Sequence, residues 1–234
     1  MSGALPIGPM SSGPFTAPEL RPQERLLVVP FARPHATLSW ATAGGGRARA
    51  RRVVWRQVTD AELGPDVEPG QLLRECLAKA GIADAVGLLT ARDLATFEDV
   101  ALRDGALQVR CVATVGLGNA LAVGDAPGPM RPVGTINLLV QLSRPLSEAA
   151  LVEAIALAAE ARTAAVLEAR LPSRRSLRAA TGTGTDCIVV AAPEAPGGAR
   201  YVGKHTAPGA LVGAAVREAT GRGVRRWLDE RRRP

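Results

Sequence analysis

Residues 181–186 bring together the side chains best suited to chemistry in this chain. They read Thr-Gly-Thr-Gly-Thr-Asp and lead directly into the apolar run 187–192, which is typical of a buried strand. Glycine permits close backbone approaches, so N–H groups and short hydroxyls in such a turn can face a ligand. Because the entrance of a core strand does not require this chemistry, we interpret the turn as a substrate-binding site. Its binding residues are predicted to be Thr181, Gly182, Thr183 and Gly184.

Residues 203–206, Gly-Lys-His-Thr, form a second candidate segment. It contains His205, one of two histidines, and Lys204, one of two lysines. Arginine supplies 27 of the 29 Lys and Arg residues, so a lysine beside a histidine suggests a task that a guanidinium cannot perform, such as proton transfer. We therefore expect segments 181–186 and 203–206 to face each other across a single cavity, with Thr206 among the binding residues.

The apolar periodicity predicts the elements that must position these segments. Strands are expected at 26–29, 52–58, 85–90, 107–115, 133–142 and 187–192, with a short strand near Tyr201 and Val202. Helices are expected at 71–80, 147–170 and 208–219. The first two strands should pair antiparallel across a glycine loop at 44–46. Because strands outnumber helices without strict alternation, we predict a single α+β domain with a mixed or largely antiparallel sheet packed with helices.

The two ends of the chain differ in composition from the rest. Residues 1–24 are rich in Pro, Gly and Ser without periodicity, which predicts a disordered leader. Residues 221–234 are predicted to be a basic C-terminal tail, loosened from the preceding helix by Gly221 and Gly223. The folded domain is therefore expected to cover residues 25–220.

Composition and charge bound the class of protein. A chain of 234 residues that is 47% hydrophobic can bury a substantial core. The net charge of +7 raises the possibility of a nucleic-acid partner, but the arginine runs 47–52 and 225–233 carry no aromatic ladder or zinc-ligand spacing. We predict that these arginines lie on a solvated surface and that the protein binds no nucleic acid.

Neither a membrane span nor a secretory signal is recognisable in the sequence. The longest apolar stretch, residues 149–169, is interrupted by four charged side chains. Cys76, Cys111 and Cys187 are far apart in apolar surroundings, which predicts reduced core residues. We expect a cytoplasmic protein without a membrane partner, and the sequence leaves its oligomeric state open.

Polar residues at the ends of apolar strands indicate where a pocket forms. Asn119 follows one predicted strand, and Thr135 and Asn137 lie within another, each with glycine nearby. Either asparagine alone could simply satisfy a turn backbone. Together with residues 181–186, however, they suggest that three strand ends converge on one pocket.

In these and neighbouring segments the chain resembles the adenosylcobinamide amidohydrolase family of corrinoid salvage. The resemblance spans roughly residues 26–219 and is carried in order by segments 114–120, 134–137, 181–186 and 203–206, followed by Gly209 and residues 213–216. The earlier Leu38-Ser39 pair with Gly44 and Gly45 also fits, which adds Ser39 to the binding residues. The resemblance implies hydrolysis of the amide that joins aminopropanol to the corrin of adenosylcobinamide, giving adenosylcobyric acid. The corrinoid would then be the substrate, and no cofactor is implied.

Amide hydrolysis needs a nucleophile, a proton donor for the departing amine, and donors for the oxyanion. We predict His205 as the general acid–base, although it could instead cap the following helix. Asp186 could activate water or orient the histidine, or could merely accept N–H bonds within the glycine turn. Lys204 could stabilise the oxyanion or be an ordinary surface cation. Thr185, or Thr183, could act as a covalent nucleophile if a base lay beside it.

Other functions remain open at the level of sequence. Residues 198–205 come within one residue of a phosphate-binding loop, but His205 stands where the magnesium-binding Ser or Thr belongs. A non-catalytic corrinoid-binding protein is a further alternative. With only His35 and His205 available and no paired cysteines, a metal would depend mostly on carboxylates, so we predict a metal-independent enzyme.

Overall fold

A long β-hairpin organises the N-terminal half of the molecule. In the computed structural model, which describes residues 13–64, 66–128 and 134–232, β2 (Leu26–Ser39) pairs antiparallel with β3 (Gly46–Gln57). The connecting turn uses Gly44 and Gly46 at φ values of +66° and +82°, which other residues rarely adopt. The expected antiparallel pair and its glycine loop are confirmed, although both strands are longer than predicted.

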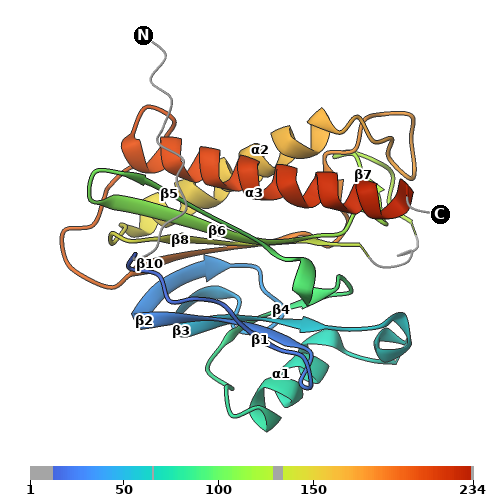
Figure 1. Ribbon diagram of the computed structural model, residues 1–234, viewed down its shortest axis with the longest axis horizontal. Coiled ribbons are helices and arrows are strands. Elements are labelled where there is room, and N and C mark those ends of the chain that lie inside the picture. Colours follow the sequence, from blue (N-terminus) through green and yellow to red (C-terminus); the bar gives the residue numbers. More distant parts are fainter. Residues whose placement is uncertain (1–12, 65, 129–133, 233–234) are drawn as a thin grey trace.

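One mixed sheet of eight strands runs through the described residues (Figure 1). Its order is β4-β3-β2-β10-β8-β6-β5, and β1 (Glu19–Arg21) adds to β2. The remaining strands are β4 (Val86–Thr90), β5 (Glu98–Asp104), β6 (Leu107–Val115), β8 (Ile136–Leu142) and β10 (Cys187–Pro193). The pairs β3–β4 and β8–β10 are parallel, and the others are antiparallel. The α+β prediction with a mixed sheet is confirmed.

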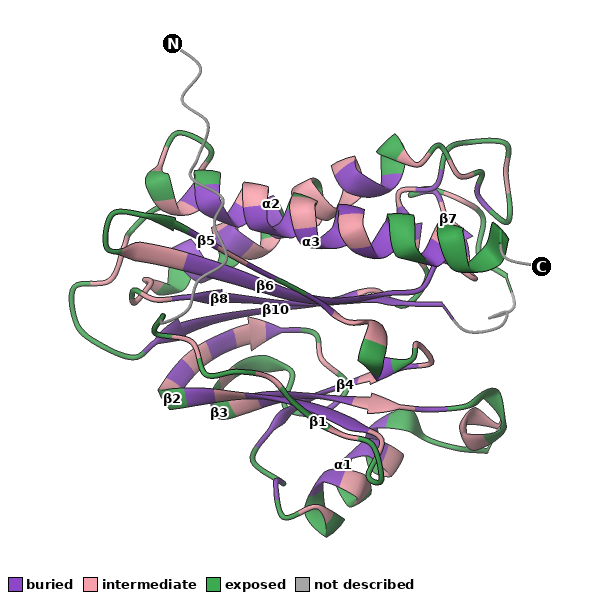
Figure 2. Cartoon of the chain, viewed as in Figure 1, coloured by how far each residue is buried: buried purple, intermediate pink, exposed green. Residues whose placement is uncertain are grey.

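The sheet folds over on itself along β2, which joins one half (β4, β3 and β1) to the other half (β10, β8, β6 and β5). Residues 26–30 of β2 pair with β3, and after an irregularity between Pro30 and His35 the strand also pairs with β10. Side chains of the two halves meet in one apolar cluster that includes Leu27, Trp55, Val112, Leu139 and Val189. Figure 2 shows the buried strands lying between the helices.

Helices cover the two outer faces of this folded sheet. On one side, α2 (Glu148–Glu168) and α3 (Ala207–Arg232) pack on β5, β6, β8 and β10 around the largest apolar cluster. On the other, α1 (Pro69–Lys79) buries Leu73 and Leu77 against β2, β3 and β4. The resulting layers run helix, sheet, sheet, helix (Figure 1). Two short 3-10 helices, Asp60–Leu63 and Leu94–Thr96, lie in the connections.

The predicted C-terminal tail is wrong, because α3 does not end near Ala219. Its glycines permit close packing instead of loosening the helix: a Cβ atom on Gly223 would lie 2.5 Å from Val115 Cγ2 of β6. Ion pairs then hold the last turns, with Arg226 Nε 2.7 Å from Glu98 and Glu230 bound by both terminal nitrogens of Arg92. The basic residues up to Arg232 therefore belong to the folded domain, and residues 233–234 lie outside the described part.

The predicted leader also needs correction within its described part. Residues 19–21 form β1, and the buried Arg110 side chain donates a 2.7 Å hydrogen bond to the Thr16 carbonyl oxygen. Residues 1–12 lie outside the described part. Elsewhere, β5 was not predicted, and the strand expected at Tyr201 and Val202 does not form.

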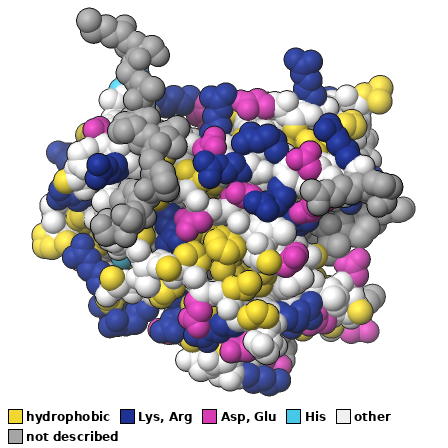
Figure 3. Space-filling view, in the orientation of Figure 1, with side chains coloured by type: hydrophobic (Ala, Val, Ile, Leu, Met, Phe, Trp, Pro, Cys, Tyr) yellow, Lys and Arg dark blue, Asp and Glu magenta, His cyan; other side chains and the backbone are white. Residues whose placement is uncertain are grey.

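Acidic and basic side chains are intermixed over the surface. Figure 3 shows them interspersed on the face it presents. Along β3, Arg47 pairs with Glu148, Arg49 with Glu194 and Arg56 with Glu62. Among the described residues, no helix is long and apolar enough to cross a membrane.

Candidate active site

Three chain segments that carry polar residues meet at one end of the sheet. The two-residue strands β7 (Ala120–Leu121) and β9 (Gly182–Thr183) pair with each other below α2. The Gly116 amide donates to the Thr135 carbonyl oxygen at 2.9 Å, and the Thr135 and Thr185 hydroxyl oxygens lie 2.6 Å apart. The predicted convergence of segments 116–120, 134–137 and 181–186 is therefore confirmed.

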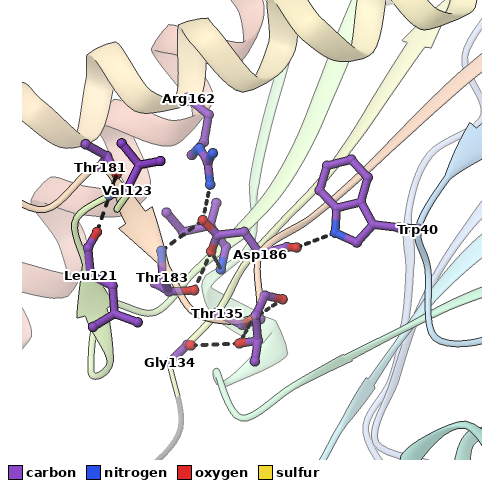
Figure 4. Close-up of polar contacts among 11 residues, drawn as sticks. Trp40, Leu121, Val123, Gly134, Thr135, Arg162, Thr181, Thr183 and Asp186 are labelled. Atoms are coloured by element: carbon purple, nitrogen blue, oxygen red, sulfur yellow. Dashed lines mark hydrogen bonds and ion pairs between the residues drawn. The ribbon is translucent and has the colours of Figure 1, made fainter. Parts of the chain in front are cut away.

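The Asp186 carboxylate fastens this corner together (Figure 4). It accepts hydrogen bonds from the Ile136 and Thr183 amides, each at 2.9 Å, and from the Thr183 hydroxyl. It also forms an ion pair with Arg162 of α2, and its side chain is 8% exposed. Its oxygens accept four donors, so the contacts of Asp186 are those expected of a carboxylate that holds the glycine turn in place.

Gly182 makes this arrangement possible. A Cβ atom at this position would collide with both the Asp186 carboxylate and the Arg162 guanidinium. The neighbouring Thr181 fixes the other side of the turn, because its amide donates to the Leu121 carbonyl and its hydroxyl accepts from the Val123 amide, both at 2.9 Å. Thr181, Gly182 and Thr183 thus shape the corner.

A cavity of about 420 Å³ opens beside the corner. Its polar lining includes four residues predicted from the sequence: Asn119, Thr135, Asn137 and Thr185. Its apolar wall comes from β4 and from the segment that follows β3: Val58, Leu63, Leu88 and Leu89. An apolar pocket with a few convergent polar groups is the usual form of a small-molecule site.

Hydrogen bonds fix most of these polar side chains. The Thr135 hydroxyl donates to the Thr185 carbonyl oxygen at 2.9 Å, and the Thr185 hydroxyl reaches the Gly134 carbonyl oxygen at 3.3 Å. Asn137 Nδ2 donates to the Leu89 carbonyl oxygen at 2.7 Å, which ties β8 to β4. Within the described part of the chain, the buried Asn119 Oδ1 has no hydrogen-bond partner. The hydroxyl pair is therefore held in place at the cavity wall.

Trp40 and Asp60 are among the lining residues that the sequence did not predict. Trp40 follows β2 and is 52% exposed, while its Nε1 donates to the Asp186 carbonyl oxygen at 2.6 Å. Asp60 begins the 3-10 helix after β3 and is the one charged residue among those that line the cavity. The signal for Asp60 was its position directly after a strand, behind Thr59; nothing in the local sequence distinguished Trp40.

Two further residues near the cavity have structural roles. Cys187 lines it, but burial raises the pKa of its thiol to about 12, so the thiol stays protonated at neutral pH. Ser39 is buried at the end of β2, where its hydroxyl accepts a 3.3 Å hydrogen bond from the Ala41 amide. Ser39 thus supports the turn that carries Trp40 and is not among the lining residues.

Residues 203–206 lie elsewhere, at the start of α3. In Figure 1 this start is at the left end of the helix layer, whereas β7, the partner of β9, is at the right. His205 is exposed, and Lys204 forms an exposed ion pair with Glu160 of α2. Neither lines the cavity among the described residues. The expectation that segments 181–186 and 203–206 face each other across one cavity is wrong.

The segment 203–206 is instead a helix cap. The Thr206 hydroxyl accepts from the Gly209 amide at 3.1 Å and donates to the Gly203 carbonyl oxygen at 2.8 Å. Helix capping was the alternative role predicted for His205, and the neighbouring Thr206 has that role instead. Gly209 is required here, because its Cβ would collide with the Val202 and Gly203 carbonyl oxygens.

Residues 198–205, which nearly match a phosphate-binding loop in sequence, have a different structural role. The Val202 amide donates to the Glu153 carboxylate at 2.5 Å, so a negative charge occupies the side of the loop where a phosphate would lie. A Cβ atom on Gly198 would lie 2.9 Å from the backbone of Pro145 and Leu146. This loop therefore packs against the start of α2 and offers no phosphate cradle.

Candidate metal ligands do not gather in the described part of the chain. No three side chains of the His, Cys, Asp and Glu types lie close enough there to hold an ion. The three cysteines are free; Cys111 and Cys187 are buried and Cys76 is half-buried.

Comparisons with known proteins connect this architecture to a family. Residues 13–232 match the family described as adenosylcobinamide amidohydrolase. A Halobacterium salinarum protein named adenosylcobinamide amidohydrolase is 37% identical over 219 residues, covering 87% of this chain and 85% of that protein. A Methanocaldococcus jannaschii protein, the uncharacterized MJ1613, is 35% identical over 92 residues, covering 39% of this chain and 36% of that protein.

Among solved structures, the PH0078 protein of Pyrococcus horikoshii aligns with a TM-score of 0.45 at 11% identity. The alignment covers 88% of this chain and 77% of that one. A likeness at this level carries no functional argument.

Proposed function

The chain belongs to the adenosylcobinamide amidohydrolase family, and we propose that it hydrolyses the amide linking aminopropanol to the corrin of adenosylcobinamide. The products are adenosylcobyric acid and free aminopropanol. The observation that carries this proposal is the cavity of about 420 Å³ beside the 181–186 turn, whose lining combines apolar walls with hydroxyl, amide and carboxylate groups. This turn is also, together with residues 203–206, the most specific part of the family resemblance.

The lining residues have complementary chemical capacities for amide hydrolysis. Asp60 is the one lining group that can take a proton from water and return it to a departing amine. The Thr185 hydroxyl can turn its one proton from the Gly134 carbonyl oxygen, 3.3 Å away, to the oxygen of a tetrahedral intermediate, while the Thr135 hydroxyl donates to Thr185 and holds it in place. We assign Asp60 as general base and acid, and the Thr185 hydroxyl, positioned by Thr135, as the oxyanion donor.

The proposed reaction uses water directly. Water adds to the amide carbonyl carbon while Asp60 accepts its proton; the carbon–nitrogen bond then breaks as Asp60 returns the proton to nitrogen. We prefer this route to a covalent threonine because the contacts of the Thr185 hydroxyl are the Thr135 hydroxyl and the Gly134 carbonyl, neither of which is a base. His205 and Lys204, the groups first predicted for proton transfer and oxyanion binding, have no part in this route.

We also propose that the enzyme acts in the cytoplasm on a free corrinoid, without a bound cofactor and without nucleic acid. Three free cysteines support a reducing compartment. Extensive pairing of arginines with carboxylates supports the absence of a phosphate-binding surface.

The proposed reaction is tested by incubating the purified full chain with adenosylcobinamide and resolving the products by mass. The expected corrinoid product is lighter by the aminopropanol arm and heavier by one water, with an equal amount of free aminopropanol. Tight binding of the corrinoid without release of aminopropanol would contradict hydrolysis and favour a non-catalytic corrinoid-binding protein.

A further inference from the structure

Trp40 combines exposure with a fixed position at the cavity. The chain has three tryptophans; Trp55 is fully buried and Trp227 is 8% exposed, whereas Trp40 is 52% exposed. Leaving such a large apolar side chain in water forgoes much of the free energy that its burial would provide. Because Trp40 also lines the cavity, its exposed surface lies where a ligand would enter.

The orientation of the indole is fixed by a hydrogen bond to the 181–186 turn. Trp40 Nε1 donates to the Asp186 carbonyl oxygen at 2.6 Å, next to Thr185 in the chain (Figure 4). A side chain that is already ordered loses little conformational entropy when a ligand packs against it. The ring is therefore prepared for contact with a flat partner.

The size of the cavity indicates which part of a substrate meets this ring. A cavity of about 420 Å³ is near the lower end of the usual range for small-molecule sites. A corrinoid with its macrocycle, side arms and adenosyl group is much larger than that range. The arm that carries the reacting amide can enter, while the conjugated rings remain at the mouth, where Trp40 lies.

We propose that Trp40 stacks against a flat conjugated ring of the corrinoid at the cavity mouth and sets the affinity for the whole substrate. This inference rests on the proposed function, because it takes a corrinoid as the ligand. The flat ring is either the corrin macrocycle or the adenine of the adenosyl group. Both present a conjugated face, and the test below separates them.

The test compares four full-length proteins: wild type, Trp40→Ala, Trp40→Phe and Tyr201→Ala. Tyr201 is the matched control, an aromatic residue that is 64% exposed and lies in the loop before α3. Dissociation constants are measured by equilibrium dialysis with adenosylcobyric acid, the product that the enzyme does not consume, through the corrinoid's own absorbance, and kcat and KM for adenosylcobinamide are measured separately. Thermal unfolding checks that every variant is folded.

We expect Trp40→Ala to raise the dissociation constant and KM about tenfold or more, in line with aromatic stacking, with a smaller change in kcat. Trp40→Phe, which keeps a ring face but loses the indole N–H, should stay within about threefold of wild type, and Tyr201→Ala should be unchanged. A phenylalanine variant as weak as the alanine variant would contradict stacking, because the hydrogen bond to Asp186 would then be what matters.

The remaining arms distinguish the possible failures. Repeating the comparison with cobinamide that lacks the adenosyl group assigns the contact to the macrocycle if the tenfold difference persists, and to adenine if it disappears. An unchanged dissociation constant for Trp40→Ala, in a protein that still releases aminopropanol, overturns the stacking and leaves the proposed function intact. Binding that weakens as expected in a protein that releases no aminopropanol overturns hydrolysis and leaves the stacking intact.

Discussion

Residues 181–186 and 203–206 look alike in sequence and do different work in the structure. Both combine glycine, threonine and a charged side chain. The hydrogen bonds of the first segment reach across the fold, from Asp186 to the Ile136 amide of β8 and to Arg162 of α2. In the second, the bonds of Thr206 are local and reach no further than Gly203 and Ala210, and among the described residues the one bond to a distant residue is the exposed ion pair of Lys204 with Glu160.

This difference separates a site from a helix cap. Long-range bonds around Asp186 assemble three chain segments and leave a cavity beside them, whereas local bonds around Thr206 satisfy the first turn of α3. The types of residue in a segment therefore indicate what chemistry they could do. Whether they form a site depends on whether their hydrogen bonds join segments that are distant in the sequence. Variants in matched pairs, one from each region, test this distinction.

The largest expected difference is in turnover, between Asp60→Asn and His205→Ala. Removing the proposed general base should lower kcat/KM by about 10²–10⁴-fold. The exposed His205 lies outside the cavity lining, so its removal should leave kcat/KM within about twofold. The measurement is release of aminopropanol from adenosylcobinamide.

Asp84→Asn is the matched control for the loss of a carboxylate, because Asp84 is exposed, lies 3.7 Å from Arg52 and is not among the residues that line the cavity. Its turnover should equal that of wild type. A severe loss in His205→Ala together with an active Asp60→Asn would overturn the comparison and return the catalytic role to the loop before α3.

The next largest difference is in the free energy of unfolding, between Asp186→Ala and His205→Ala. Removing Asp186 leaves the guanidinium of Arg162, whose side chain is 15% exposed, without its partner. Breaking a buried ion pair in this way costs about 3–5 kcal/mol, whereas an exposed substitution costs less than about 0.5 kcal/mol. Urea unfolding followed by circular dichroism measures both values, and equal stabilities would show that the corner is not fastened by Asp186.

The sequence was sufficient for the parts of the fold that depend on local pattern. The glycine loop at 44–46, the strand at 107–115 and the Ser147 cap of α2 follow from turn chemistry, apolar alternation and capping preference. The end of α3 could not be predicted, because Gly223 is favourable there only through its contact with Val115 of β6. That contact is tertiary and leaves no local signal.

The site was predictable in part for the same reason. Asn119, Thr135 and Thr185 could be grouped because each lies at the end of an apolar strand, and strand ends meet at sheet edges. The prediction that Asp186 and His205 face one cavity was wrong. Suitable side chains in two nearby segments of the sequence do not determine where the second segment lies in the fold. Trp40 and Asp60 were missed because only the folding of the sheet brings β2, β3 and β10 around one cavity.

A smaller difference is expected between Thr185→Val and Thr206→Val. Valine keeps the shape of threonine and removes the hydroxyl, so Thr185→Val should lower kcat by about tenfold or more through loss of an oxyanion donor. Thr206→Val should lower the free energy of unfolding by about 1 kcal/mol through loss of the helix cap and leave kcat unchanged. Turnover and urea unfolding are measured on both proteins, and the reverse pattern would assign the chemistry to the second region.

The smallest expected effect is that of exhaustive chelation, which should leave turnover unchanged. The carboxylate at the corner is already saturated by Arg162 and three hydrogen bonds, and Asp60 is the one carboxylate among the residues that line the cavity. A divalent ion needs more oxygen or nitrogen ligands than this.

Loss of activity restored by one added metal would contradict this prediction. Activity that survives chelation in the wild-type protein and is lost in Asp60→Asn would keep the chemistry in the cavity beside Asp186.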